Sequence, residues 1–380
     1  MRGGVGKAGQ PIGSDYALDR VLNNHLRSSL YIYEKPFLDF PLSGREASRV
    51  MRTTVLLCRN IRSIYRSDHN KRLRSSAKLT AQHVPFRGIY GIPVTPFNED
   101  ETIDWKSMES VLHFTVEAGC HGVVMPVMVS EFQVLTDDER RQIVETTVRV
   151  VGGRVPVVAG VTGIANAHSI GMAKHAEDAG VDAVIAMPPH SKPTTESEVL
   201  RFFHELGASV DIPVFVQNFG GAYAMPTDTL AQLSHDVPNL SYVKEEGSDP
   251  LQAATRIIEA AGDDILGVMG GFGARMLLDE WRRGEAGNMP SSHYGDVHSN
   301  IWNLLEAGDE EGARAMYQRI LPLVLHDDLP VLKEIFVRRG IIANSTMRSP
   351  YGIHGPDKHG WAEIDYLYER ASDLFTWKKS

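Results

Sequence analysis

The chain has 380 residues, of which 42% are hydrophobic, enough for one large domain with a closed core and some extra material. This composition excludes a long disordered protein, and the formal net charge of -9 leaves no overall positive field that would attract nucleic acid or an anionic membrane. A small-molecule ligand is therefore the expected partner.

The first 84 residues differ in composition from the rest of the chain. Residues 45–78 are rich in arginine and lysine, and their only acids are Glu46 and Asp68. We predict a solvated, poorly ordered basic extension over 1–84, which a start codon placed too early would also produce, with Met51 as a later candidate. A mitochondrial transit peptide and a nucleic-acid-binding tail are the alternatives for such a segment.

Cysteine content and hydropathy bear on the compartment. Cys58 and Cys120 are the only cysteines, and two cysteines make no disulfide framework in a chain of this length. No apolar run approaches the roughly 18 residues that span a bilayer, and the N-terminal residues lack the basic-then-apolar order of a secretory signal. We therefore expect a soluble, cytoplasmic protein that does not bind membranes.

From residue 88 onward, short β-branched apolar runs alternate with amphipathic stretches long enough for helices. Eight strands are predicted, at 88–94, 122–127, 155–159, 183–187, 213–217, 241–244, 265–269 and 287–289. The predicted helices between them include 104–118, 137–151, 166–179 and 226–235. Eight β/α units favour a closed (β/α)8 TIM barrel over 85–292, with the active site at the carboxyl ends of its strands.

A doubly wound open sheet is the alternative fold for this alternation. Such a sheet usually has fewer strands and a glycine-rich phosphate loop after the first one, whereas here VTPF follows at 94–97. Residues 293–380 are predicted to add a small bundle of C-terminal helices, at 294–325, 330–339 and 361–375, that packs on the barrel. The predicted fold class is thus α/β, a TIM barrel with a C-terminal helical extension and a poorly ordered N-terminal arm.

Lys244 ends the predicted sixth strand, where an unpaired lysine pointing into a barrel would be expensive to bury. Burial favours the neutral form of an amine, and a neutral amine can attack a ketone. Because side chains alternate along a strand, Glu246 would share the face of Lys244 while Glu245 would face away. The pattern predicts a nucleophile and an acid/base in one pocket; a structural Lys–Glu ion pair is the alternative.

Several motifs in a fixed order carry a family resemblance over 88–375. They are GIPVTPF at 91–97, SE at 130–131, LTDDER at 135–140, GRVPVVAG at 153–160, PP at 188–189, IPV at 212–214, Asn218 and VKE at 243–245. With these motifs the chain resembles the dihydrodipicolinate synthase and N-acetylneuraminate lyase family of class I Schiff-base lyases. The resemblance implies a (β/α)8 barrel, a homotetramer, and Lys244 as the lysine that forms a Schiff base with a 2-oxo acid.

The chain departs from the usual family pattern at several positions. It has VMVSE at 127–131 where Gly-Thr-Thr-Gly-Glu is usual, QN at 217–218 where Tyr-Asn is usual, and HS at 190–191 where tyrosines are common. Ala222 stands near the place of the arginine that binds the amino-acid aldehyde. These departures argue against the family's tyrosine–threonine proton relay and against lysine biosynthesis.

One subgroup matches the departures better. The chain resembles L-2-keto-3-deoxyarabonate dehydratase in VQ at 216–217, SE at 130–131 and KEE at 244–246. The resemblance implies dehydration of a 2-keto-3-deoxy sugar acid held as a Schiff base on Lys244, with Glu246 as the acid/base. A pyruvate-dependent aldolase and a dihydrodipicolinate synthase-like enzyme use the same imine and are alternatives; a non-catalytic sugar-acid-binding protein is a more distant one.

Six further residues are predicted to bind substrate. Backbone N–H groups near Met128, Val129 and Ser130 would hold its carboxylate, and this role needs no threonine side chain. Gln217 and Asn218 would orient hydroxyl groups or a water molecule. Gly270 belongs to the cluster GGFG at 270–273, which lines the pocket near the imine in the family; a phosphate cradle is the weaker interpretation of that cluster.

The histidines suggest no metal site. Their spacing includes no ligand pattern such as H-E-x-x-H, so we expect no catalytic metal and no cofactor. His190 follows two prolines at a strand end and would either meet the tail of the substrate or have a simple loop role. Expected partners are a small 2-oxo acid and further copies of the chain.

Overall fold

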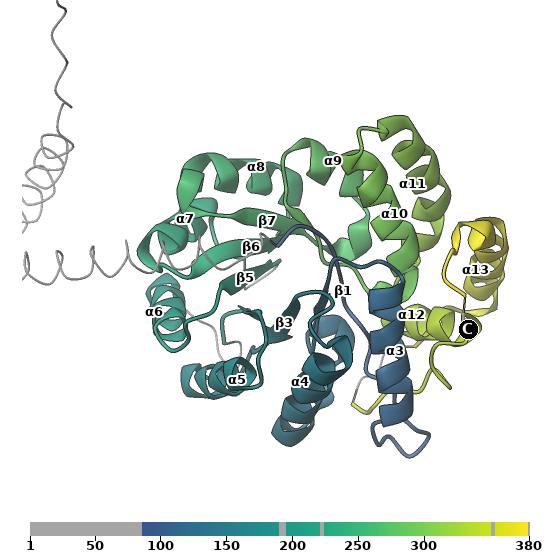
Figure 1. The fold of residues 1–380 in the computed structure, drawn as a ribbon, viewed down its shortest axis with the longest axis horizontal. Coiled ribbons are helices and arrows are strands. Elements are labelled where there is room, and N and C mark those ends of the chain that lie inside the picture. Colours follow the sequence, from purple (N-terminus) through teal and green to yellow (C-terminus); the bar gives the residue numbers. More distant parts are fainter. Residues whose placement is uncertain (1–85, 190–194, 221–223, 351–353, 379–380) are drawn as a thin grey trace, which may run out of the picture. The chain divides into compact units, whose positions relative to one another are not determined.

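In the part of the chain that the structure describes, parallel strands form a closed barrel of eight. The computed structural model describes residues 86–189, 195–220, 224–350 and 354–378 (Figure 1). Each strand pairs with the next, and β1 pairs with β8, which closes the barrel and excludes the open sheet. The strands are β1 (Gly88–Gly91), β2 (Gly122–Val124), β3 (Val157–Gly160), β4 (Ala183–Ala186), β5 (Val214–Phe219), β6 (Leu240–Glu246), β7 (Gly267–Gly270) and β8 (Gly287–Asn288).

Helices surround this barrel, so the predicted TIM-barrel fold is confirmed (Figure 1). The α-helices are α3 (Trp105–Glu117), α4 (Asp137–Val151), α5 (Asn166–Asp178), α6 (Glu196–Gly207), α7 (Thr227–Asp236), α8 (Pro250–Ala261), α9 (Leu277–Arg282), α10 (Gly295–Glu306), α11 (Glu310–Val324), α12 (Leu329–Arg338) and α13 (Lys358–Ala371). The 3-10 turns are η1 (Met128–Ser130), η2 (Phe132–Val134), η4 (Gly262–Asp264), η5 (Phe272–Ala274), η6 (Ser292–Tyr294) and η7 (Ser372–Leu374). The predicted basic extension over 1–84 lies outside the described residues.

The start of the α4 helix shows how local sequence fixes an element. Thr136 accepts a hydrogen bond from Glu139 N, and the Glu139 carboxylate accepts one from Thr136 N. This reciprocal capping box satisfies two backbone donors that the first turn of a helix leaves free. Thr195 and Glu198 repeat the arrangement at the start of α6.

The barrel interior is filled by large side chains at the amino-terminal end of the strands. The Phe86 ring lies 5.4 Å from that of Phe215 and 5.2 Å from that of Tyr242, and the latter two rings stack at 4.5 Å. Alternation then places Lys244, two residues after Tyr242, on the same inner face but nearer the carboxyl end. These three aromatic rings fill the amino-terminal end of the barrel, and polar side chains such as Lys244 lie toward its carboxyl end.

The strands that carry the predicted site are also the longest. Parallel pairing of β5 with β6 runs from Val214 to Phe219 and places Gln217 beside Lys244. Neighbouring residues in register on parallel strands point to the same side of a sheet. The Gln217 and Lys244 side chains consequently project together into the carboxyl end of the barrel.

The C-terminal segment differs from the prediction in one respect, because the expected helix over 294–325 is two helices. α10 ends at Glu306 and α11 begins at Glu310. Between them Gly308 has φ +82°, which favours glycine, and the Asp309 side chain accepts from Gly312 N to start the new helix.

Among the described residues, no helix is both long enough and apolar enough to cross a membrane.

The α12 helix packs against α3 on the side of the barrel (Figure 1). Phe336 of α12 and Phe114 of α3 meet edge to face, with ring centroids 6.0 Å apart. α12 is therefore part of the layer that covers the barrel, and α13 lies beyond it (Figure 1). This contact brings residues near 333 close to the first two β/α units.

Candidate active site

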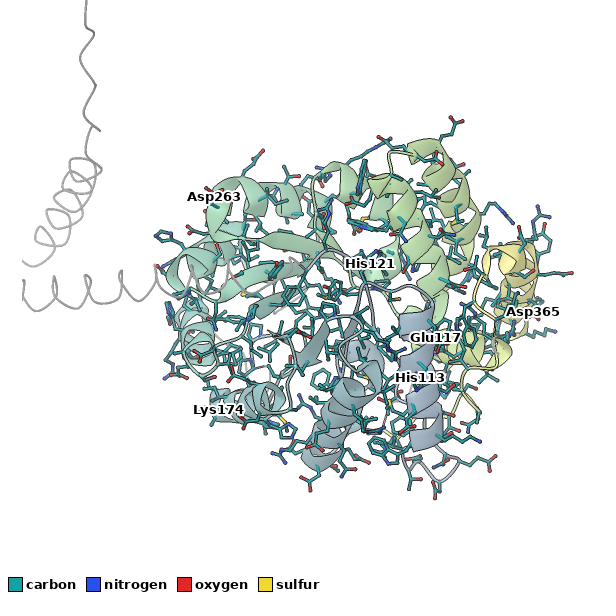
Figure 2. The ribbon with its side chains drawn as sticks, viewed as in Figure 1. His113, Glu117, His121, Lys174, Asp263 and Asp365 are labelled. Carbon is teal, nitrogen blue, oxygen red and sulfur yellow. The ribbon has the colours of Figure 1, made fainter. Side chains whose placement is uncertain are left out.

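A buried amine and carboxylate lie side by side near the carboxyl end of β6. Lys244 Nζ is 3.0 Å from Glu246 Oε2, and the two side chains are 6% and 8% exposed. Charged groups that are buried to this degree are held in place by partners. By contrast, the labelled side chains of Lys174 and Asp263 lie at the periphery of the molecule (Figure 2).

Two further donors fix the Glu246 carboxylate. Gln217 Nε2 donates to Glu246 Oε2 at 2.9 Å, and the Phe272 backbone N–H donates to Oε1 at 3.2 Å. With Lys244, three donors from β5, β6 and the segment after β7 converge on one carboxylate. Such convergence holds the carboxylate in a single orientation beside the amine, the arrangement that proton transfer between a base and a reacting centre requires.

The segment after β7 approaches Glu246 closely. A Cβ atom on Gly271 would lie only 2.1 Å from Glu246 Oε1, so a residue without a side chain is needed there. Phe272 and Ala274 have φ of +48° and +63°, which is unusual for residues other than glycine. This backbone aims the Phe272 N–H at Glu246, and strain of this kind collects at functional sites.

Glu245 and Asn218 lie on the opposite face of their strands, toward the helices. Asn218 Nδ2 donates to Glu245 Oε2 at 2.8 Å, and Asn218 Oδ1 accepts from Met225 N at 2.7 Å. Glu245 Oε1 accepts from Gly247 N at 2.7 Å. The structure thus separates Asn218 from the predicted site, because alternation along β5 sends it outward when Gln217 points inward.

Residues 125–136, which we call the β2–α4 loop, contain the residues predicted to hold a carboxylate. Ser130 is buried, its N–H donates to Val127 O, and its hydroxyl donates to Pro93 O at 2.8 Å. The N–H groups of Met128 and Val129 have no hydrogen-bond partner among the described residues. Of the three residues, Met128 and Val129 therefore have free donors, and Ser130 instead joins the loop to the segment that follows β1.

Gly270, also predicted to bind substrate, borders a different carboxyl group. A Cβ atom there would lie 2.2 Å from Glu280 Oε1 and 2.6 Å from Asn288 Nδ2. Asn288 Nδ2 donates to Glu280 Oε2 at 2.7 Å. Gly270 thus faces α9, and Gly271 is the glycine that faces Glu246. Burial raises the pKa of Glu280 to about 8, and the hydrogen bond from Asn288 opposes this rise.

Glu280→Gln is expected to stabilise the protein more at pH 8 than at pH 5. The unfolded chain loses this proton near the ordinary value of 4.5, whereas the folded protein keeps it up to a pKa of about 8. Ionisation of the unfolded chain therefore lowers wild-type stability as the pH rises through this window, and an amide avoids the loss. One pKa unit corresponds to about 1.4 kcal/mol, so the gain is on the order of a few kcal/mol. Thermal unfolding of both proteins at the two pH values measures it; an equal gain at both would contradict the assignment.

No group of three or more histidine, cysteine, aspartate or glutamate side chains could hold a metal ion within the described ranges. His121 Nδ1 accepts from Ile89 N, and its other ring nitrogen is 3.0 Å from Asn303 Oδ1. His190 and Ala222 lie outside the described residues. The described geometry thus centres on Lys244 and Glu246.

The sequence model of the Dihydrodipicolinate synthetase family matches residues 85–359. The chain belongs to this family. Its members are lyases, and the predicted enzyme class is confirmed. The family also contains relatives of different names, so membership alone does not specify the substrate.

Two relatives illustrate this range. The chain is 27% identical over 305 residues to L-2-keto-3-deoxyarabonate dehydratase from Azospirillum brasilense, which covers 78% of the chain and 98% of the relative. It is 32% identical over 245 residues to 4-hydroxy-tetrahydrodipicolinate synthase from Pseudomonas putida (strain W619), covering 62% of the chain and 80% of the relative. Both the dehydratase and the synthase names thus occur among its similar proteins.

Solved structures of family members show the same fold. Dihydrodipicolinate synthase from Thermotoga maritima superposes with a TM-score of 0.70 at 19% identity, covering 77% of this chain and 100% of that one. The prophage protein YagE from E. coli K12, solved in complex with pyruvate, gives a TM-score of 0.69 at 22% identity, covering 76% and 99%. At these identities the likeness concerns the fold.

Lys333, a buried cation of this dihydrodipicolinate synthetase family enzyme, was not predicted from the sequence. Lys333 on α12 is fully buried and forms an ion pair with the Glu131 carboxylate in the β2–α4 loop. A signal was present in the sequence, because Leu329, Leu332, Lys333 and Phe336 follow the i, i+3, i+4, i+7 spacing of one helix face. A lysine on an apolar stripe requires a buried partner.

Proposed function

We propose that this enzyme dehydrates a 2-keto-3-deoxy sugar acid, with L-2-keto-3-deoxyarabonate as the first candidate substrate. The observation that carries the proposal is the buried Lys244–Glu246 pair, 3.0 Å apart, at the carboxyl end of a TIM-barrel strand. The dehydratase relative supports the substrate class, since the chain covers 98% of its length. Gln217 at the position of the usual tyrosine supports it further.

Lys244 begins the reaction by attacking the C2 ketone of the substrate. Glu246 can take a proton from the Lys244 ammonium across the 3.0 Å contact, which leaves the neutral amine that the attack needs. Condensation releases one water and gives a protonated imine. The imine draws electrons from C3 and so makes a C3 proton removable.

Glu246 then carries out the elimination. Its carboxylate removes the C3 proton, the resulting enamine expels the C4 hydroxyl, and the same proton leaves with that hydroxyl as water. An ordered water can relay the proton where the family tyrosine is missing. A further water hydrolyses the imine, frees Lys244 and releases a 2-oxo acid that is lighter than the substrate by one water.

The rest of the pocket would hold the substrate. The free N–H groups of Met128 and Val129 are suited to the carboxylate, because oriented backbone N–H groups bind anions. The Gln217 amide is near enough to Glu246 to orient a substrate hydroxyl or the water. Asn218 is not assigned a substrate contact, because its side chain is hydrogen-bonded to Glu245 and to the Met225 backbone. A homotetramer and a cytoplasmic location, both expected by resemblance to the family, complete the proposal.

The principal rival is an aldolase that uses the same imine but breaks the C3–C4 bond and releases pyruvate. A dihydrodipicolinate synthase-like reaction is a second rival, because similar proteins carry the synthase name. A sugar-acid-binding protein without activity is a weaker rival, because binding alone does not require a buried amine beside a carboxylate. These rivals differ in their products, which makes them separable.

Incubation with 2-keto-3-deoxy acids, followed by mass spectrometry, tests the reaction. We expect L-2-keto-3-deoxyarabonate to yield a product of the same carbon number lighter by one water. Borohydride added during turnover should attach substrate covalently to Lys244 and leave the peripheral Lys174 unlabelled. Pyruvate plus an aldehyde would instead establish the aldolase, and the absence of a Lys244 adduct would refute the Schiff base.

A further inference from the structure

The β2–α4 loop forms polar contacts with Lys333 and Arg348, two residues that follow the barrel in the sequence. Lys333 Nζ pairs with Glu131, donates to Thr346 O at 2.7 Å, and lies 4.6 Å from the centre of the Phe97 ring. Both side chains of the ion pair are fully buried. Glu131, which comes directly after the predicted carboxylate-binding residues, is thereby connected to α12 and to the segment between β1 and α3.

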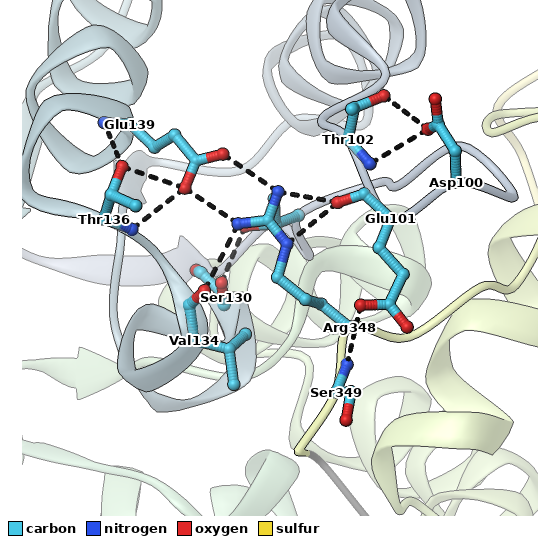
Figure 3. Close-up of polar contacts among 10 residues, drawn as sticks. Asp100, Glu101, Thr102, Ser130, Val134, Thr136, Glu139, Arg348 and Ser349 are labelled. Carbon is cyan, nitrogen blue, oxygen red and sulfur yellow. Dashed lines mark hydrogen bonds and ion pairs between the residues drawn. The ribbon is translucent and has the colours of Figure 1, made fainter.

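Arg348 makes a second tie to the same loop. One guanidinium nitrogen donates to Val134 O at 3.2 Å and to Glu139 at 2.8 Å, and the other donates to Glu139 at 2.9 Å and to Glu101 O at 2.6 Å. Figure 3 shows these contacts converging on Arg348 from three segments. A bidentate pair with a carboxylate has both strength and a fixed geometry.

The backbone of the loop explains why it needs such ties. Glu131 has φ +56°, a left-handed conformation that costs free energy for a residue other than glycine. It lies between η1 and η2, as the C-cap of the first and the N-cap of the second, so its conformation sets the direction of the N–H groups just before it. Burial raises the pKa of Glu131, and the nearby Lys333 opposes that rise. The ion pair therefore stabilises both the charge and the turn.

We propose that Lys333 and Arg348 are positioning residues, which set the affinity of this enzyme for the substrate carboxylate by holding the β2–α4 loop. The inference rests on the proposed function, in which Met128 and Val129 bind that carboxylate. Neither positioning residue touches the reacting atoms. Loosening the loop should therefore weaken substrate binding and leave the chemistry at Lys244 intact.

Arg348→Gln is the first test, with pyruvate as the probe and borohydride trapping at Lys244 as the readout. We expect the half-saturating pyruvate concentration to rise by about tenfold to a hundredfold, the loss that a small misplacement of a binding group produces, with the maximal trapping rate retained. Arg338→Gln is the matched control, because Arg338 lies on α12 but pairs with Glu334 and Asp365 at the surface. An equal half-saturating concentration in Arg348→Gln and the control would overturn the proposal.

A double variant and a second readout keep the test independent of folding and of the proposed function. Glu131→Gln with Lys333→Met removes both buried charges together, so neither is left unpaired. Amide hydrogen exchange over 128–134 should be faster in the double variant and in Arg348→Gln than in the control. Unchanged exchange would refute the role of the ties. If wild-type protein traps neither pyruvate nor a 2-keto-3-deoxy acid, the proposed function fails, and the exchange comparison still decides whether Lys333 and Arg348 hold the loop.

Discussion

Glu246→Gln is expected to keep imine formation at Lys244 but to slow dehydration by roughly 10²- to 10⁴-fold, the usual contribution of a general acid/base. The amide cannot accept the C3 proton or return it to the leaving hydroxyl. It does preserve the shape of the side chain between Gln217, Lys244 and the Phe272 N–H. The Lys244 amine itself is unchanged by this substitution, so the nucleophile should survive.

Steady-state rates together with borohydride trapping separate the outcomes. Trapping with slow turnover supports Glu246 as the acid/base, whereas loss of both would show that it acts mainly on Lys244. Normal turnover would contradict the assignment. Glu280→Gln is the matched control, because that carboxyl is buried nearby but faces α9 and is protonated below its pKa of about 8. Glu245→Gln is a poorer control, since its two oxygens accept from Asn218 and from Gly247 N.

Strand periodicity predicted the centre of the candidate site. The alternation of side chains along β6 was enough to place Glu246 with Lys244 and to turn Glu245 away, as the structure shows. The same rule, applied to β5, would have placed Asn218 opposite to Gln217. The family motif suggested substrate contact for both residues, although adjacent residues of a strand cannot share a face.

Contacts distant in the sequence could not be predicted in this way. Arg348 meets Glu139, 209 residues earlier, and no local pattern encodes that pairing. The conformation of the segment after β7 could not be predicted either, because the sequence GGFGA does not indicate that Phe272 and Ala274 both adopt positive φ. Packing of the whole chain selects these features, and this packing determines which glycine of the cluster meets Glu246.

Gly271→Ala provides the sharpest test of that packing. The new methyl group would lie 2.1 Å from Glu246 Oε1 and 2.4 Å from its carboxyl carbon, far inside van der Waals contact. Three donors hold the carboxylate in a buried site, so it cannot move aside without losing them. The backbone has little freedom either, since Phe272 already has an unfavourable φ of +48°.

We therefore expect Gly271→Ala to fold and to lose dehydration by at least about a hundredfold, because a displacement near 1 Å of a catalytic group has an effect of this size. Gly171→Ala on α5 is the matched control, since a Cβ atom there meets nothing within 4 Å. Turnover, thermal unfolding and trapping at Lys244 should be measured for both variants. A folded Gly271→Ala enzyme with wild-type turnover would mean that the Glu246 carboxylate need not occupy its observed position, and the proton transfers would then have to be assigned to another group.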